Sequence, residues 1–172
     1  MEVTEAILKR RSVRKYKEDK VPDNILEKIL QAAQLAPSAK NLQPWRFVVV
    51  TDKEIREKLV PACANQKFVG EAPVVIAGVG INPSLVMRCG ITAQTVDLSI
   101  ALTQIVLQAT ELGLGTCFIG AFHQDQVKQV IGIPEEYVVV QVLTLGYPDE
   151  EPAPRPRLSL QEIIYKDSWG NK

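Results

Sequence analysis

The sequence of 172 residues has few of the side chains that build metal sites or disulfide scaffolds. It contains one histidine, His123, and three widely spaced cysteines, Cys63, Cys89 and Cys117, with no Cys-x-x-Cys pair. A histidine-rich metal site is therefore excluded, and an odd number of distant cysteines favours a reducing compartment over a disulfide framework. We expect a cytoplasmic protein without a metal.

The chain also lacks net charge and a long apolar run. Its 20 basic side chains balance its 20 acidic ones, which disfavours a general nucleic-acid-binding protein of high pI. Its start, MEVTEAILKRRS, has no apolar region typical of a secretory signal. The most apolar helical segment, residues 93–112, carries five glutamine, aspartate or glutamate side chains, which a membrane span would not tolerate. Neither nucleic acid nor membrane is expected as a partner.

Nucleotide-binding loops and catalytic triads are missing as well. Neither GxGxxG nor GxxxxGK[ST] occurs, and Gly113-Leu114-Gly115 is interpreted as a helix stop. The single histidine is interpreted as a surface or capping residue rather than a catalyst. Catalytic side chains are therefore not predicted.

The content of hydrophobic residues, 46%, is that of a globular protein, and the length predicts one domain, residues 1–172. Apolar, β-branched runs predict strands at 46–51, 74–79, 116–119 and 137–145. Helical spacing and caps predict helices at 5–9, from 23 towards Pro37, from Asp52 towards Cys63, and at 93–112 and 124–130. Together they predict a sheet covered by helices. Residues 146–172 are too proline-rich for a core of their own and are predicted to form an arm that packs on something else.

Three polar clusters are candidates for a binding site. Arginines in 10–14 present forked donors that match phosphate oxygens, although a solvated charge run is the alternative. In residues 37–45, prolines fix a turn of small polar residues that could lay its backbone against a flat polar ring. The same pattern equally suits the end of a helix followed by the start of a strand. Prolines hold residues 152–157 extended, so that Arg155 and Arg157 project on the same side and could bind an anion together. The alternative is that this segment is only a feature of the surface.

Four blocks give the sequence a resemblance to the nitroreductase family of flavoproteins. These are ILKRRSVRKYKEDKVPDNILEKILQAAQLAPSAKNLQPWRFVVV, NQKFVGEAPVVIAGVG, ELGLGTCFIGAF and LTLGYPDEEPAPRPRLSLQEIIY. The resemblance covers almost the whole chain, and its most specific part is the arginine-serine-arginine start followed by PS-x-x-N-x-QPW.

The resemblance implies an α+β fold with a mixed β-sheet sandwiched by helices, assembled as an intertwined homodimer with FMN at two interfacial sites. It implies a ping-pong oxidoreductase in which hydride passes from NADH or NADPH through flavin N5 to a nitroaromatic, quinone or similar small-molecule acceptor. The cofactor carries that chemistry, so no catalytic side chain is expected.

The residues implied to contact FMN come from five segments of the chain. They are Arg10, Arg11, Ser12, Arg14, Pro37, Ser38, Ala39, Asn41, Asn65, Ile119, Gly120, Arg155 and Arg157. Residues 10, 12, 155 and 157 would bind the phosphate, residue 11 would add a further contact, and residue 14 would lie near the ribityl chain and the N1–O2 edge. Segment 37–41 would reach the flavin of the partner subunit. Residue 65 would bond the pyrimidine edge, and the backbone of 119–120 would face N5 and O4.

Two departures from the family's pattern leave alternatives open. Ile119 stands where many members carry glutamate, which predicts a less polar environment on that side of the flavin. Residues 80–90 replace one or two helices and predict a short lid, with Cys89 exposed beside the opening. The same fold could therefore run another flavin reaction, such as a dehydrogenation or dehalogenation, or bind flavin without nicotinamide turnover. An RNA-binding module using residues 10–17 is disfavoured by the neutral total charge.

Overall fold

Four strands form one sheet in the order β1-β2-β4-β3, in a computed structural model that describes residues 2–172. The strands are β1 (Trp45–Val50), β2 (Val74–Gly80), β3 (Gly115–Ile119) and β4 (Val138–Gly146). All four predicted strands are thus confirmed, with ends that differ by one residue. The central strand β2 is buried along its whole length, as its run of Val, Ile, Ala and Gly requires.

Every neighbouring pair in this sheet is antiparallel. Val50 pairs with Val75 and Ile119 pairs with Val142, so the connection through α3 and α4 and the connection through α6 each return to the end of the sheet that they left. The connection through α5 instead crosses from one end of the sheet to the other, because Gly80 pairs with Val138 and Gly115 pairs with Gly146. Within residues 2–172 the only parallel pairing is an isolated bridge between Ser12 and Thr116. The α+β class is confirmed, whereas the expectation of a mixed sheet is wrong for the four strands of this chain.

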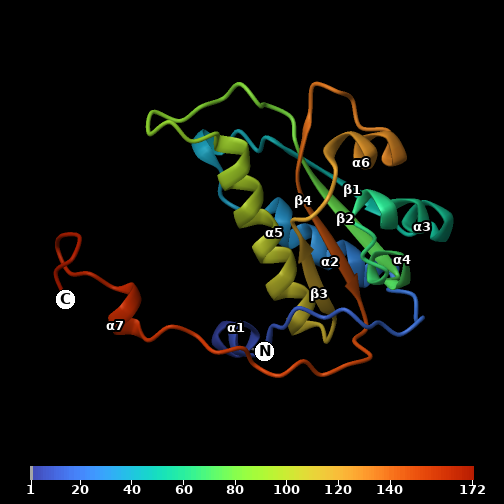
Figure 1. Cartoon of the computed structure of the whole chain (residues 1–172), viewed down its shortest axis with the longest axis horizontal. Helices are drawn as coiled ribbons and strands as arrows, with labels where there is room; N and C mark the ends of the chain where they lie inside the picture. The colour runs from blue at the N-terminus through green and yellow to red at the C-terminus, as the bar shows by residue number, and fades with distance from the viewer. Residues whose placement is uncertain (1) are drawn as a thin grey trace.

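Helices cover both faces of the sheet (Figure 1). On one face lie α2 (Asp23–Gln34) and α5 (Ala93–Glu111), which bury Ile29, Leu98 and Leu102 against β2 and β4. The end of α5 is the predicted one, because Gly113 adopts a φ of 79° that other residues rarely take. The short α1 (Val3–Lys9) packs against α5 and begins two residues before its predicted start.

The opposite face carries α3 (Lys53–Ala62), α4 (Phe68–Glu71) and α6 (Gln124–Ile131). Asp52 caps α3 as predicted, since its carboxylate accepts a hydrogen bond of 3.0 Å from the Ile55 N–H. The single turn of α4 was not predicted, because four residues are too few to show a helical period. None of the helices in residues 2–172 has the length and apolarity that crossing a membrane requires.

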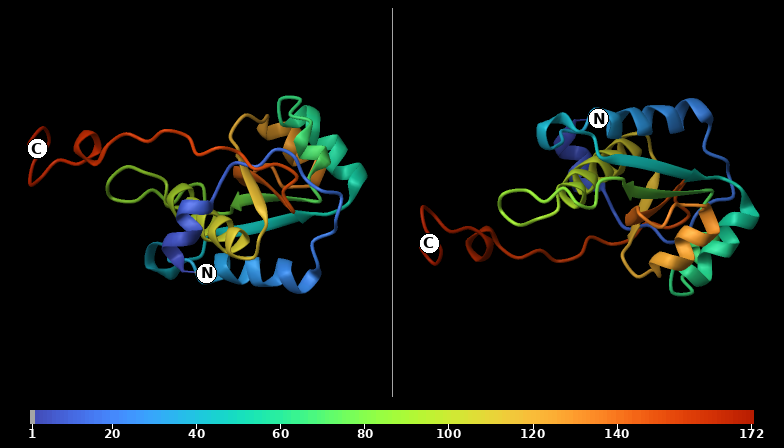
Figure 2. Two further views of the ribbon diagram at one scale, coloured as in Figure 1. Left: turned by 90° about the horizontal axis from the view of Figure 1, so that it is seen from below. Right: turned by 90° about the horizontal axis from the view of Figure 1, so that it is seen from above.

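Beyond residue 150 the chain leaves the body as an exposed arm (Figure 2). It contains one turn of helix, α7 (Leu160–Ile163), whose capping box joins Ser159 and Glu162. Its large apolar side chains are exposed, and Trp169 is 90% exposed. No residue of 151–172 is buried, and the packing of this arm on another surface stays a prediction.

A tight contact between Gly115 and Val13 provides a test of how the N-terminal segment packs on β3. A Cβ added at Gly115 would lie 2.6 Å from Val13 Cγ2 and 2.8 Å from Val13 Cβ, and the latter atom cannot move without the backbone. We expect Gly115→Ala to lower the free energy of unfolding by about 1–3 kcal/mol in urea titrations. Gly120→Ala is the matched control, because its Cβ would meet nothing within 4 Å. Equal unfolding midpoints for the two variants would contradict the packing.

Candidate flavin site

The arginine-rich segment 10–17 runs beside the edge strand β3. The Val13 N–H donates to the carbonyl of Thr116 at 2.9 Å. Beneath the segment, the Tyr16 hydroxyl donates to the Val13 carbonyl at 2.6 Å and shares a hydrogen bond of 2.7 Å with Thr144 Oγ1. Burial raises the pKa of Tyr16, so this hydroxyl keeps its proton at neutral pH. The backbone that carries Arg10, Ser12 and Arg14 is therefore fixed to the sheet.

The root of the C-terminal arm lies along the other side of the same segment. The Lys17 N–H donates to the Tyr147 carbonyl and the Asp149 N–H donates to the Lys15 carbonyl, each at 2.9 Å. The Glu150 carboxylate then accepts hydrogen bonds from the N–H groups of Arg14, at 2.6 Å, and Lys15, at 3.2 Å. Segments 12–17 and 147–150 thus form one bonded unit, although some 130 residues separate them in the sequence.

The side chains of the three N-terminal arginines differ in their surroundings. Arg14 is exposed, with its guanidinium carbon 5.9 Å from the centre of the Phe68 ring. Arg11 donates to the carbonyls of Leu8, at 2.7 Å, and Arg10, at 2.9 Å, and so closes the end of α1. Within residues 2–172, neither Arg10 nor Arg14 forms an ion pair. Arg10 and Arg14 are therefore open to an anion, whereas the guanidinium of Arg11 is engaged by its own helix.

Cys117 lies beneath these arginines, close enough to Arg10, Ser12 and Arg14 for each to act on its thiol. Burial raises the pKa of Cys117, and the two guanidinium groups only partly oppose this. The thiol consequently stays protonated, and it does not add a negative charge under the cationic segment.

The turn after α3 and the loop after β3 are tied together. Ala64 and Asn65 both adopt left-handed backbone conformations, with φ of 54° and 57°. The Gln66 side chain donates to the carbonyls of Cys63, at 2.9 Å, and Ala121, at 3.2 Å. These bonds hold Asn65 near the residues that follow Gly120. Because Phe68 follows closely in the chain and lies under Arg14, the two loops adjoin the arginine segment.

β3 ends at Ile119 and Gly120 follows it, and only the backbone of these two residues can border a ligand there. The side chain of Ile119 is 1% exposed and packs in the core under α3 and α6. This side chain therefore does not border the open space beside Gly120, and the expectation of a less polar environment on that side of the flavin stays a prediction. Successive strand residues face opposite sides, so Phe118 is exposed instead. At Gly120 an added Cβ would meet nothing within 4 Å, which leaves open space beside the backbone.

Segment 37–41 lies far from the arginines of its own chain. The Ala39 N–H donates to the buried Asp97 carboxylate at 3.2 Å, close to the start of α5. Segment 10–17 lies near the other end of α5 (Figure 1), and a helix of 19 residues is about 28 Å long. The structure thus places Ser12 beside Thr116 of β3, Arg14 over Phe68, and the Asn65 turn beside the loop after Gly120, and it places residues 37–41 apart from them.

The turn at residues 37–43 has a defined shape, because three of its residues adopt left-handed backbone conformations: Lys40, Asn41 and Gln43. The Gln43 N–H donates to Ser38 Oγ at 3.0 Å, and the exposed edge of the turn carries Pro37 and Asn41. The neighbouring loop 81–92 contains no helix and exposes Cys89, as predicted. Segment 37–43 and loop 81–92 lie at the same end of α5, so neither approaches the arginine segment 10–17 of its own chain (Figure 1).

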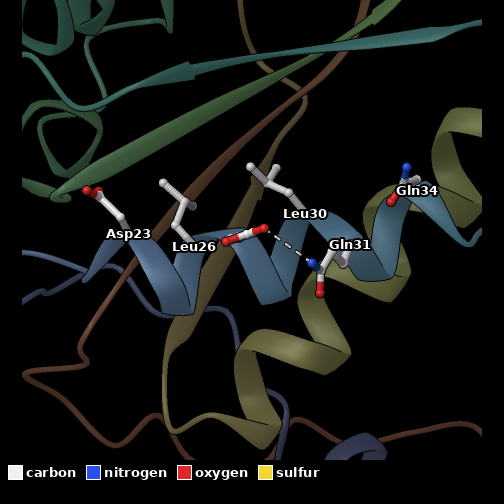
Figure 3. A pocket seen from close by; sticks show the side chains of 6 residues that line it. Asp23, Leu26, Leu30, Gln31 and Gln34 are labelled. Carbon is white, nitrogen blue, oxygen red and sulfur yellow. Dashed lines mark hydrogen bonds between the residues drawn. The ribbon is translucent and has the colours of Figure 1, made fainter.

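The two arm arginines, Arg155 and Arg157, are exposed. Within residues 2–172 they make no hydrogen bond or ion pair, so one chain alone does not join them to Arg10. A hollow of about 590 Å³ lies elsewhere, on the outer face of α2 (Figure 3). It is lined by Asp23, Glu27, two leucines and two glutamines, a set without a cation for a phosphate.

Sequence reasoning missed two residues of this site. Gln66 and Glu150 act through side-chain bonds to the backbone of segments distant in sequence. Glu150 sits in the acidic run Asp149-Glu150-Glu151, and nothing local distinguishes it from its neighbours. Only the long-range pairing of the arm root with segment 12–17 could have identified it.

An antiparallel sheet between two helical layers, with an N-terminal arginine segment bonded to the root of a C-terminal arm, defines an α+β protein of nitroreductase type. The model of the nitroreductase family matches residues 7–82 and 64–147. A relative from Methanothermobacter thermautotrophicus, described as an NADH dehydrogenase/NAD(P)H nitroreductase, is 39% identical over 98% of this chain and 88% of its own. The chain belongs to the nitroreductase family.

Solved structures agree with this assignment. A nitroreductase family protein from Clostridium novyi superposes with a TM-score of 0.83 at 33% identity, over 99% of this chain and 96% of that one. An NADPH:FMN oxidoreductase from Vibrio harveyi, solved in complex with NAD+, gives a TM-score of 0.89 at 29% identity, over 99% of this chain and 79% of that one. The similarity extends through the arm as well as the body.

Proposed function

We propose that this protein is an FMN-dependent oxidoreductase that moves a hydride from NADH or NADPH to a nitroaromatic, quinone or similar acceptor by a ping-pong mechanism. One observation carries the proposal. Arg14, which forms no ion pair within residues 2–172, lies over Phe68, three residues beyond the Asn65 turn that Gln66 ties to the loop after Gly120, so that a cation adjoins a border made of backbone. The names of the similar proteins from Vibrio harveyi and Bacillus subtilis, an NADPH-flavin oxidoreductase and an FMN reductase, support it.

The residues present fit FMN. A phosphate monoester carries a charge between −1.5 and −2 at pH 7, as is known for phosphoserine, and guanidinium groups bind such oxygens through charge-assisted hydrogen bonds. Arg10 and Ser12 would hold the phosphate together with Arg155 and Arg157 of the arm. The open space at Gly120 would admit a flat ring against the backbone of residues 119–120.

When bound, FMN would supply the hydride transfer, and the chain's own residues would place and polarise it. Arg14 would set a fixed positive charge near the N1–O2 edge, where reduction increases negative charge. Asn65 would bond the pyrimidine edge from its left-handed turn. The hydride transfer itself needs no proton from a side chain of this protein.

We propose further that residues 1–172 form one domain and that the protein is a homodimer in which Pro37, Ser38, Ala39 and Asn41 approach the partner's flavin. Their distance from the arginines of the same chain supports this arrangement. The outer face of α5 suits close helix packing, because Ser99 and Thr103 donate their hydroxyls to their own helix at 2.7 Å. The side chain of Ile100 between them is partly exposed. A cytoplasmic location is part of the proposal and rests on the three free cysteines.

An anaerobic titration tests the proposed function. The purified protein should be yellow, with one FMN per chain, and NADH or NADPH should bleach the flavin without any added acceptor. Adding menadione or a nitroaromatic should then restore the absorbance. FMN that stays oxidised under both nicotinamides would favour a flavin-binding protein without nicotinamide turnover, and a colourless protein that takes up no added FMN would refute the cofactor.

Gln66→Ala is expected to weaken FMN and riboflavin binding to the same extent, roughly five-fold, since each hydrogen bond contributes about 1 kcal/mol. The substitution frees the Asn65 turn from Ala121, and this affects the ring edge rather than the phosphate. Fluorescence titration of the deflavinated protein measures both affinities. Gln124→Ala is the matched control, because its side chain also bonds backbone, at Val139, but on α6. A loss confined to FMN would show that Gln66 acts on another part of the site.

A further inference from the structure

We propose that Glu150 is a positioning residue that joins the two groups of arginines in the phosphate site, an inference that rests on the proposed binding of FMN. Its carboxylate is the last group of the arm, within residues 2–172, that hydrogen-bonds to the body of the protein. The residues it holds, Arg14 and Lys15, belong to the N-terminal arginine segment. The residues it precedes in the chain include both arm arginines.

The geometry of the contact explains why an acidic side chain stands here. Both hydrogen bonds, at 2.6 Å from Arg14 and 3.2 Å from Lys15, end on the same oxygen, Oε1. The backbone bonds between segments 15–17 and 147–149 stop at Asp149, so the side chain of Glu150 continues the attachment that the backbone no longer makes. A carboxylate accepts hydrogen bonds more strongly than a neutral group and therefore holds these two N–H groups tightly.

The chain that follows can transmit this position to the arginines. Pro152, Pro154 and Pro156 restrict residues 151–157 to an extended conformation that behaves as a semi-rigid spacer of about 3.1 Å per residue. Arg155 is five residues beyond Glu150, and so lies within about 16 Å of it. The direction in which the arm leaves Glu150 consequently decides where Arg155 and Arg157 are presented.

If Glu150 acted only through its charge, its removal would change the affinity for FMN in the opposite direction. A carboxylate near Arg14 adds negative charge beside a site for a dianion, and its removal would then strengthen FMN binding. The carboxylate forms no ion pair within residues 2–172, so it does not neutralise Arg10 or Arg14 directly. The positioning role and the charge role thus predict changes of opposite sign, and substitutions can separate them.

Four variants of the full-length protein test the proposal by fluorescence titration with FMN and with riboflavin, which lacks the phosphate. Glu150→Ala should weaken FMN binding about ten-fold and riboflavin binding less than two-fold. Glu150→Gln keeps an acceptor at Oε1 and should remain within about three-fold of the wild type. Glu150→Asp keeps the charge but shortens the reach, and should lose FMN affinity as the alanine variant does. Glu151→Ala, at the exposed neighbour, should bind as the wild type does.

A double substitution supplies the second readout. If Glu150 acts through the arm arginines, Glu150→Ala should weaken FMN binding no further in a protein that already carries Arg155→Ala and Arg157→Ala. FMN binding more than about three-fold tighter in Glu150→Gln, equal losses for FMN and riboflavin, or full additivity in the triple variant would each overturn the proposal. Should the alanine variant not fold, the aspartate and glutamine variants decide the same question. Wild-type protein that binds FMN without reacting with nicotinamides would refute the proposed function and leave this inference standing.

Discussion

Removal of residues 159–172 is expected to abolish the proposed homodimer and the FMN content together. These residues expose Leu160, Ile163, Ile164 and Trp169, and they make no hydrogen bond to the body of their own chain. Apolar side chains of this number need a surface to cover them, and interfaces of obligate dimers usually exceed about 2,000 Å². Sedimentation velocity at micromolar concentration should show a monomer, and the flavin absorbance should fall in the same preparation.

The control for this truncation is the body of the protein itself. The three core clusters lie within residues 13–147, so the far-ultraviolet circular dichroism per residue of the body should persist in the truncated chain. Removal of Lys172 alone should leave both the dimer and the flavin intact. A truncated protein that remains dimeric, or a full-length monomer that holds FMN tightly, would contradict the role given to the arm.

Arg157→Ala is expected to weaken FMN binding by about 10- to 100-fold. A charge-assisted contact to phosphate contributes about 1.5–3 kcal/mol, and the loss should take this size where the contact is shielded from water. Riboflavin should bind nearly as it does to the wild type, because it has no phosphate. Titration of deflavinated protein with the two ligands gives the ratio directly.

A matched loss of one positive charge checks that the effect of Arg157→Ala is local. Lys58 is exposed on α3, within the helical layer opposite α5. Lys58→Ala should leave the affinity for FMN unchanged at a fixed ionic strength. If the two substitutions weaken FMN binding equally, or if Arg157→Ala weakens riboflavin binding as much as FMN binding, then Arg157 does not bind the phosphate.

Much of the secondary structure could be predicted because its signals are local. Runs such as Val74–Ile76 identify buried strands, and the periodic apolar residues of 93–112 with Gly113 behind them identify the long helix. Asp52 could be recognised as a cap because its partner, Ile55, lies three residues away. The arginines of 10–14 stood out for the same reason, since their charges are adjacent in the sequence. Each of these features depends on contacts within a few residues.

Other features depend on which face of an element is buried, and the local pattern left that open. The pattern around Ile119 predicted a strand but not that its side chain enters the core while Phe118 is exposed. The purely antiparallel sheet follows from where each connection re-enters it, which depends on the packing of α3, α4 and α6. The turn of α4 forms because Phe68 and Val69 bury themselves there, and four residues carry no period of their own.

The sequence by itself determined that this chain would form four strands, a long buried helix, an arginine-rich start and an arm without a core. The tertiary structure alone decided that Arg14 and Lys15 meet Glu150 across more than 130 residues, and that Gln66 ties the Asn65 turn to Ala121. It also decided that residues 37–41 lie at the opposite end of α5 from the arginines (Figure 1). Such contacts form only when the helices and strands pack together, because the free energy that selects them comes from burial of the whole core rather than from any one segment.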